Sequence, residues 1–312
     1  MPDTTRRVKF GVRIHQRGYS FDSLREIWIE ADRLGYYSAT LIDLLNAPLL
    51  ECWTTLSALT PLTHQIRLTP LVLAAPYRPP ALLAKMASTL DVISGGRLEL
   101  GLGSGGSEPD QHAAGIPFLP AAAQVARLEE TLQAMLTLWH QTSTTFNGQY
   151  YTFTDAQQVP GPVQRPHPPL LIGGHGERYL MRTMARYADI ANIGFELSLD
   201  AYAHKRAILA AHCQRIGRDP AAIELSQNTR VMIAPTRTEL EQRIRDEAEH
   251  AGQSVERYRA ALARAVVGTP DECVAQLAPY VESGIRYFFV LFPHPIWIHD
   301  LRLFAETVLS RF

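Results

Sequence analysis

Apolar residues recur along most of the chain at two alternating spacings. Short apolar runs, typical of buried strands, are followed by stripes at intervals of three and four residues, typical of helices with one buried face. Strands are predicted over 8–14, 37–42, 66–73, 97–100, 170–173, 190–193, 223–234 and 285–292. Helices are predicted over 21–34, 53–62, 78–94, 121–139, 178–187, 200–216, 237–250 and 270–283. Alternation of this kind predicts an α/β protein, most readily a (β/α)8 TIM barrel, with an open doubly wound sheet as the alternative.

The stretch 78–106 contains the most informative local pattern. Its predicted helix has an apolar stripe made by Leu82, Leu83, Met86, Leu90 and Ile93, and it ends at the pair Gly95 and Gly96. After the strand 97–100, Gly101, Gly103, Gly105 and Gly106 are expected to form a loop at its carboxyl end. Three of these glycines match the dinucleotide-binding spacing G-x-G-x-x-G. That motif requires a helix to open at its last glycine, whereas 107–120 is predicted as a broken loop, so a nicotinamide site is disfavoured.

Two segments interrupt the regular alternation. Residues 144–153 place an Asn-Gly dipeptide between β-rich arms, which predicts a small hairpin insertion. Residues 160–169 contain five prolines and are predicted to be an extended connector. Because neither segment is a linker of the kind that separates domains, residues 1–312 are expected to form a single domain.

Bulk composition excludes several classes of partner. The net charge of −1 gives no general attraction to nucleic acid or to an anionic membrane, and the 46% hydrophobic content is ordinary for a globular protein. The chain lacks an apolar run long enough to span a membrane, and residues 1–10 lack the apolar core of a secretion signal. Cys52, Cys213 and Cys273 are too far apart for a paired metal motif and are expected to be buried structural thiols. A cytoplasmic protein without a metal is therefore expected.

In a barrel, functional groups gather where the strands end. Asp43 follows the second predicted strand, and His15, His112 and His175 are the histidines predicted to face the mouth. Gly173, Gly174, His175, Gly176 and Glu177 form a loop that leads from a strand toward a helix. Free amides and close backbone approach at such a loop suit a phosphate. A glycine turn that only connects the two elements is an equal alternative.

Four segments resemble the bacterial luciferase-like superfamily, and in particular its branch that depends on the deazaflavin coenzyme F420. They read LLECWTTLSALTPLTHQIRL (49–68), YRPPALLAKMASTLDVISGGRLELGLGSG (77–105), HPPLLIGGHGERYLMRTMARYADIANI (167–193) and VGTPDECVAQLAPYVESGIRYFFV (267–290). The resemblance implies a (β/α)8 barrel that binds F420, or alternatively FMN, with the ring over the mouth near strands two to four. It also implies a homodimer through the helices after strands two and three.

The resemblance assigns roles to particular residues. The cofactor phosphate would lie at Gly173, Gly174 and Gly176, while Gly103, Ser104 and Gly105 would shape the pocket wall. A bulge at Pro70, Leu71 and Val72 would support the ring, with a cis peptide expected at Pro70–Leu71. Asp43 would orient groups near the reactive ring, and Arg127 is a further candidate to bind an anion or, equally, a solvated helix charge.

Two positions depart from the F420 branch. Leu44 stands where relatives usually have histidine after the aspartate, and Gly106 stands where they often have tryptophan or an acidic residue. His15, Glu108 and His112 are therefore considered as substitutes for the missing side chains. The leading hypothesis is hydride transfer between F420 and a small organic substrate, with the reduced cofactor supplied by a separate reductase or dehydrogenase. The alternatives are an FMN-dependent monooxygenase that uses reduced flavin and oxygen, and a flavin-binding protein without turnover.

Overall fold

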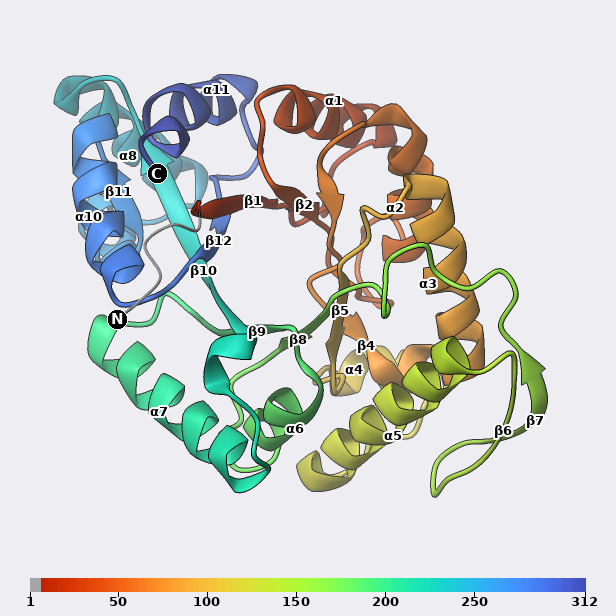
Figure 1. Cartoon of the computed structure of the whole chain (residues 1–312). Helices are drawn as coiled ribbons and strands as arrows, with labels where there is room; N and C mark the ends of the chain where they lie inside the picture. The colour runs from red at the N-terminus through yellow and green to blue at the C-terminus, as the bar shows by residue number, and fades with distance from the viewer. Residues whose placement is uncertain (1–6) are drawn as a thin grey trace.

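A ring of parallel strands, covered on the outside by helices, forms the centre of the protein in a computed structural model that describes residues 7–312 (Figure 1). The strands follow one another around the ring as β1 (Lys9–Arg13), β2 (Ser38–Thr40), β3 (Arg67–Leu68) with β4 (Leu73–Ala74), β5 (Leu100–Gly103), β8 (Leu170–Gly173), β9 (Ile190–Phe195), β10 (Glu224–Ile233) and β12 (Tyr287–Leu291). A parallel bridge between Leu68 and Leu98 joins β3 to the residues before β5. This bridge closes the ring, which confirms the predicted (β/α)8 barrel and rejects the open sheet.

The helices lie between successive strands. They are α1 (Phe21–Arg33), α2 (Cys52–Leu59), α3 (Pro80–Ser94), α4 (Glu108–Ala113), α5 (Ala121–His140), α6 (Leu180–Tyr187), α7 (Leu199–Arg215), α8 (Arg237–His250), α9 (Val255–Ala261), α10 (Pro270–Glu282) and α11 (Ile298–Thr307). Single 3-10 turns occur at η1 (Thr60–Leu62), η2 (Ala75–Tyr77), η3 (Pro220–Ala222) and η4 (Leu309–Arg311). Four elements were not predicted: α4, within the expected loop, α9, the last helix α11, and the short strand β11 (Val266–Gly268), which pairs with the end of β10.

The main core lies between the outer face of the barrel and the helices. Helix α1 buries Leu24, Ile27, Trp28 and Ala31 at the spacing that the sequence predicts. Helix α3 ends at Gly95, whose left-handed backbone (φ 65°, ψ 35°) agrees with the predicted stop. The predicted apolar stripe of α3 is wrong at its edges, because Leu82 is 52% exposed and Ile93 is 60% exposed. The helix instead approaches the barrel through a face that includes the small residues Ala84 and Ala87.

The third barrel strand is interrupted in its middle. The predicted strand 66–73 divides into β3 and β4, and the segment between them contains a cis peptide at Leu71–Val72. The expected cis bond at Pro70–Leu71 is therefore wrong by one residue. The Leu71 N–H still donates to Leu41 O at 2.9 Å, so pairing with the second strand continues through Leu71 and the chain turns only after it.

Two glycines that were expected in a loop lie inside strand β5. A Cβ on Gly101 would stand 1.9 Å from the carbonyl oxygen of Pro70, and a Cβ on Gly103 would stand 2.8 Å from Val72 Cγ2. Because the segment between β3 and β4 comes so close, strand β5 must have glycine at these two positions. Because Gly101 and Gly103 belong to the strand itself, they do not form the strand-to-helix turn of a dinucleotide motif.

The predicted hairpin forms from β6 (Ser143–Asn147) and β7 (Thr152–Gln157), which pair in antiparallel fashion. Its connecting residues are anchored to α5, since the Glu130 carboxylate accepts the N–H groups of Gln149, Tyr150 and Tyr151 at 2.7–2.8 Å. The hairpin lies at the periphery, beyond α3 and α5, away from the centre of the barrel (Figure 1).

Replacing Gly101 with alanine tests the close approach between the third and fourth barrel strands. Because the added methyl meets a backbone carbonyl, we expect Gly101→Ala to lower the free energy of unfolding by about 1–3 kcal/mol. Gly106→Ala is the matched control, since a Cβ there has no neighbour within 4 Å; it should stay within about 0.5 kcal/mol of the native protein. Urea unfolding followed by circular dichroism measures both, and equal midpoints for the two variants would contradict the assignment.

Candidate active site

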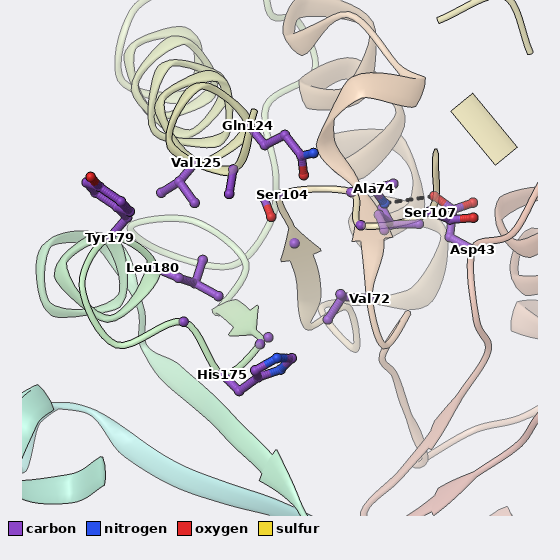
Figure 2. A pocket seen from close by; sticks show the side chains of 18 of the residues that line it. Asp43, Val72, Ala74, Ser104, Ser107, Gln124, Val125, His175, Tyr179 and Leu180 are labelled. Carbon is purple, nitrogen blue, oxygen red and sulfur yellow. Dashed lines mark hydrogen bonds between the residues drawn. The ribbon is translucent and has the colours of Figure 1, made fainter. Parts of the chain in front are cut away.

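A cavity of about 530 Å³ lies at the carboxyl ends of β4, β5 and β8. The first turn of α5 and the segment that begins α6 form its outer wall, and Figure 2 shows Val125, Tyr179 and Leu180 on that side. The lining residues are Asp43, Leu44, Val72, Leu73, Ala74, Tyr77, Gly103, Ser104, Gly105, Gly106, Ser107, Ala121, Gln124, Val125, Gly173, Gly174, His175, Gly176, Glu177, Arg178, Tyr179 and Leu180. The cavity therefore occupies the position where (β/α)8 barrels have their active sites.

Two strand-end glycines give the cavity a floor without projecting side chains. A Cβ on Gly103 or on Gly173 would stand 2.8 Å from a methyl group of Val72. Val72 thus fills the place that side chains of β5 and β8 would otherwise take. The floor that results is made of glycine backbone and the apolar side chain of Val72, which suits the face of a planar ring system.

Asp43 is held tightly at one side of the cavity. Its carboxylate accepts two hydrogen bonds from Arg78, at 2.8 and 3.0 Å. It also accepts one from the Ala74 N–H at 3.0 Å, drawn as a dashed line in Figure 2. Arg78 also donates to Glu51, which caps the start of α2, at 2.6 Å. Burial opposes the positive charge of Arg78, but the two carboxylates raise its pKa above the usual value. Because both oxygens of Asp43 are occupied by protein donors, its role here is to position the cavity wall.

The 173–177 loop offers unused backbone donors at the other side of the cavity. Gly174 has a φ of 142°, which favours glycine, and its N–H is taken by Asn192 O at 3.0 Å. Within the part of the chain that the structure describes, the N–H groups of His175, Gly176 and Glu177 have no acceptor. The carboxylate of Glu177 lies 3.3 Å from Lys205 Nζ, and this hydrogen bond lowers the pKa of Glu177. The loop can therefore receive an anion through its amides without strong repulsion from its one acidic side chain.

The histidines predicted to face the mouth occupy different places. His175 lines the cavity, and its ring extends from the β8 loop toward the side that carries Val72 (Figure 2). His112 lies on α4 with an exposed side chain that pairs only loosely with Glu108, at 3.9 Å. His15 follows β1 and is outside the lining of the cavity; burial, followed by Arg17 and Arg13, lowers its pKa.

Other predicted site residues support the cavity from behind. Leu71 is buried inside the barrel with Leu171 and Phe289, and Pro70 contacts β5 through its carbonyl oxygen. Arg127 is also buried, so it is neither a solvated helix charge nor part of the cavity lining. It donates to Gln111 Oε1 at 3.3 Å, and Gln111 in turn donates to Gly105 O at 2.8 Å. Arg127 therefore stabilises the loop after β5.

Several lining residues had no signal in the sequence. Tyr77 ends the 3-10 turn η2, Gln124 lies in the first turn of α5 and Tyr179 stands just before α6. At such positions periodicity does not distinguish a residue facing a cavity from one facing solvent. Burial raises the pKa of Tyr77, whose hydroxyl lies 3.4 Å from the buried carboxylate of Asp110. The only indication for Tyr77 in the sequence was its place next to Arg78 in the segment YRPP (77–80).

A second group of polar side chains lies toward the β1 and β10 side of the barrel mouth. Arg13 stands beside Thr40 in the register of β1 and β2, and its guanidinium lies 5.2 Å from the ring of Phe195. Burial lowers the pKa of Arg13, and no hydrogen bond joins its guanidinium to another residue among 7–312. Buried Thr40 Oγ1 and Asn228 Oδ1 also have no partner within that range. This side of the mouth thus contains polar groups whose hydrogen-bonding capacity is not fully used by the described residues.

Metal and membrane chemistry find no support in the described residues. Among residues 7–312, no three His, Cys, Asp or Glu side chains are grouped so that they could hold a metal ion. No helix in the same range is long and apolar enough to span a membrane. The three cysteines are free and buried, as predicted.

The match to a family model decides the family. The model described as luciferase-like monooxygenase matches residues 7–287. The chain belongs to the luciferase-like monooxygenase family. The proteins that it resembles include a monooxygenase named as FMNH2-dependent, a monooxygenase solved in complex with FMN, and F420-dependent enzymes.

Curated relatives match over part of their length. An FMNH2-dependent dimethylsulfone monooxygenase of Pseudomonas putida is 35% identical over 124 residues, which are 40% of this chain and 34% of that protein. An uncharacterized protein of Mycobacterium tuberculosis is 34% identical over 140 residues, 45% of this chain and 48% of that protein. The chain thus spans about a third to a half of these relatives' length.

Solved structures of the same fold cover nearly the whole luciferase-like chain. The monooxygenase RslO1 of Streptomyces bottropensis has a TM-score of 0.83 and 22% identity, covering 97% of this chain and 99% of that one. An F420-dependent secondary alcohol dehydrogenase, in complex with an F420–acetone adduct, has a TM-score of 0.83 and 17% identity, covering 97% and 98%. A coenzyme F420-dependent tetrahydromethanopterin reductase from Methanopyrus kandleri has a TM-score of 0.79 and 17% identity, covering 98% and 100%. At these identities the likeness shows the fold alone.

Removing Arg78 tests the anchoring of Asp43. Arg78→Met leaves a carboxylate with 1% exposure without its cation, so we expect the free energy of unfolding to fall by about 3–5 kcal/mol. The double variant Asp43→Asn, Arg78→Met should recover part of this loss, because no buried charge is left unpaired. Arg25→Gln, which breaks an exposed pair with Asp22, is the control and should cost no more than about 1 kcal/mol. Chemical denaturation measures all four proteins; an Arg78→Met loss no larger than that of the control would refute the anchoring role.

Proposed function

We propose that the protein is an F420-dependent oxidoreductase that transfers a hydride between the deazaflavin and a small organic substrate. The observation that carries this proposal is the glycine floor at the carboxyl ends of β5 and β8, next to a loop with unused amides. The F420-dependent dehydrogenase and reductase with the same fold support the choice of cofactor.

The cavity residues fit the two ends of such a cofactor. The tricyclic ring would lie on the floor made by Gly103, Gly173 and Val72, where added Cβ atoms would have no room. The phosphate would be held by the N–H groups of His175, Gly176 and Glu177. When bound, the deazaflavin supplies the carbon that accepts or donates the hydride, while the protein orients it and excludes water.

The remaining roles, which are positioning, proton transfer and contact with the substrate, are assigned to the protein's own residues. Asp43, whose two carboxylate oxygens are hydrogen-bonded to Arg78 and Ala74, positions the wall beside the ring. His175 is the titratable cavity residue whose ring faces the floor, so it is assigned the proton that leaves or enters the substrate as the hydride moves. Leu44 lines the cavity and Gly106 leaves its edge open, which makes the substrate side wider and more apolar than in relatives with larger polar residues there.

A reduced-flavin monooxygenase is the second candidate function. The relative from Pseudomonas putida that is named as FMNH2-dependent favours this alternative. The floor and the 173–177 loop would accept either ring system, because both are planar tricycles with a phosphate at the end of a ribityl chain. In both cases a separate reductase or dehydrogenase is proposed to supply the reduced cofactor.

Titration of the apoprotein separates the two candidates. We expect F420 to bind with a dissociation constant at least about tenfold below that of FMN, a difference of about 1.4 kcal/mol. Fluorescence of the deazaflavin and of the flavin follows binding directly. Tight binding of FMN without binding of F420 would reject the proposed function and favour the monooxygenase.

We also propose that the protein forms a homodimer through the outer face of α3. Exposed apolar side chains gather there from α3 and from the proline-rich connector that lies against it: Leu82, Val92, Ile93, Val159 and Val163. Exposed apolar patches of this kind commonly mark protein interfaces. The β6–β7 hairpin contributes no residue to the cavity lining, and its proposed role is to extend this contact.

Sedimentation analysis tests the dimer. Ile93→Arg places a charge within the patch at a position that is 60% exposed, so we expect it to shift the native dimer to monomer without loss of fold. Ile29→Arg, on the exposed face of α1, is the matched control and should leave the mass unchanged. A native protein that sediments as a monomer would overturn this proposal.

A further inference from the structure

A groove between α6 and α7 is lined mainly by arginine side chains. Its residues are Arg178, Tyr179, Arg182, Arg186, His212, Arg215 and Ile216, and its volume is about 450 Å³. We call it the arginine groove. Arg178 and Tyr179 also line the cavity described above, so the groove continues outward from the 173–177 loop.

The groove carries a surplus of positive charge. Arg182 and Arg186 share one carboxylate, that of Glu129, each at 3.6 Å. Within residues 7–312, Arg178 and Arg215 have no acidic partner. The net charge of the whole chain is −1, so this surplus is local and does not reflect a generally basic surface.

The groove is also connected to the loop beside it. His212 Nε2 lies 3.1 Å from Glu177 O, and Lys205 Nζ lies 3.1 Å from His175 O. The carboxylate of Glu177 is paired with Lys205, so it does not neutralise the arginines. An anion held by the amides of the 173–177 loop would therefore have four guanidinium groups on the path that leads away from the cavity.

We infer that the arginine groove binds the oligo-γ-glutamyl tail of F420. This inference rests on the proposed function, because it requires F420 to occupy the cavity. Beyond its phosphate, F420 continues into a flexible chain of glutamates with one or more free carboxylates, whereas FMN ends at the phosphate. A narrow basic groove that begins at the phosphate loop has the charge and the position to recognise such a tail. The groove thereby provides selectivity for F420 over FMN that the planar floor cannot provide.

The test compares F420 molecules that differ only in tail length. The apoprotein is titrated with F420 carrying two glutamates and with F420 carrying six, and binding is followed by fluorescence. The variant Arg182→Gln, Arg215→Gln removes two groove charges and leaves Arg186 to pair with Glu129. Arg245→Gln, an exposed arginine on α8 outside the groove, is the control for a loss of positive charge.

We expect the native protein and the Arg245→Gln control to bind the longer tail more tightly. The double variant should bind long-tailed F420 about twofold to thirtyfold more weakly, as the loss of two solvent-exposed ion pairs implies. Raising the ionic strength to about 1 M should remove the preference for the longer tail in the native protein.

Two negative results of these titrations would lead to different conclusions. Equal affinity for both tail lengths in the native protein would overturn the role of the groove while leaving an F420-dependent enzyme in place. FMN binding without F420 binding would overturn the proposed function and the tail site together. An equal loss of affinity in the Arg245→Gln control would also overturn the inference, because the effect would then reflect net charge.

Discussion

The buried carboxylate of Asp43 is the contact on which the cavity depends. It joins the end of the second barrel strand to Ala74 in β4 and to Arg78 just before α3. Through Arg78 the same network reaches Glu51 at the start of α2. A charge this deeply buried is tolerated only with full hydrogen-bonding compensation, so the three segments are fixed relative to one another. The position of Val72, and with it the shape of the floor, follows from this constraint.

The two sides of the site meet different physical demands. The floor requires the absence of side chains, and the glycines of β5 and β8 satisfy this requirement by leaving room for Val72. The outer side requires charge, which the amides of the 173–177 loop and the arginine groove provide. A cofactor with an apolar planar ring and an anionic chain matches both demands at once.

Much of the fold was predictable because barrel strands and amphipathic helices have strong periodic signals. The end of α3 at Gly95 and the start of α5 at Ala121 were placed correctly, since glycine and proline determine local backbone geometry. Helix α4 was missed because six residues with a proline at the second position have little periodicity. The exposure of Ile93 was also missed, since spacing alone cannot say which side of an apolar helix meets the barrel.

The candidate site was predictable in part. Asp43, the glycines after β5 and the 173–177 loop were expected near one another and line one cavity, because residues at the carboxyl ends of parallel strands converge whatever the packing details. His112 and His15 were placed at the mouth for the same reason, but their side chains lie outside the cavity lining. The resemblance to the luciferase-like family indicated a cofactor, and the family match agrees with it.

The sequence by itself determined the order of strands and helices, the closed barrel and the loops where a cofactor would be held, since these follow from periodicity and from local backbone preferences. Only the tertiary structure decided the functions of individual side chains. It showed that Asp43 is occupied by Arg78, that Arg127 supports a loop, and that arginines from α6 and α7 face one groove. These assignments depend on contacts between residues that are distant in the chain, and no local pattern encodes which of the possible partners a charged side chain will meet.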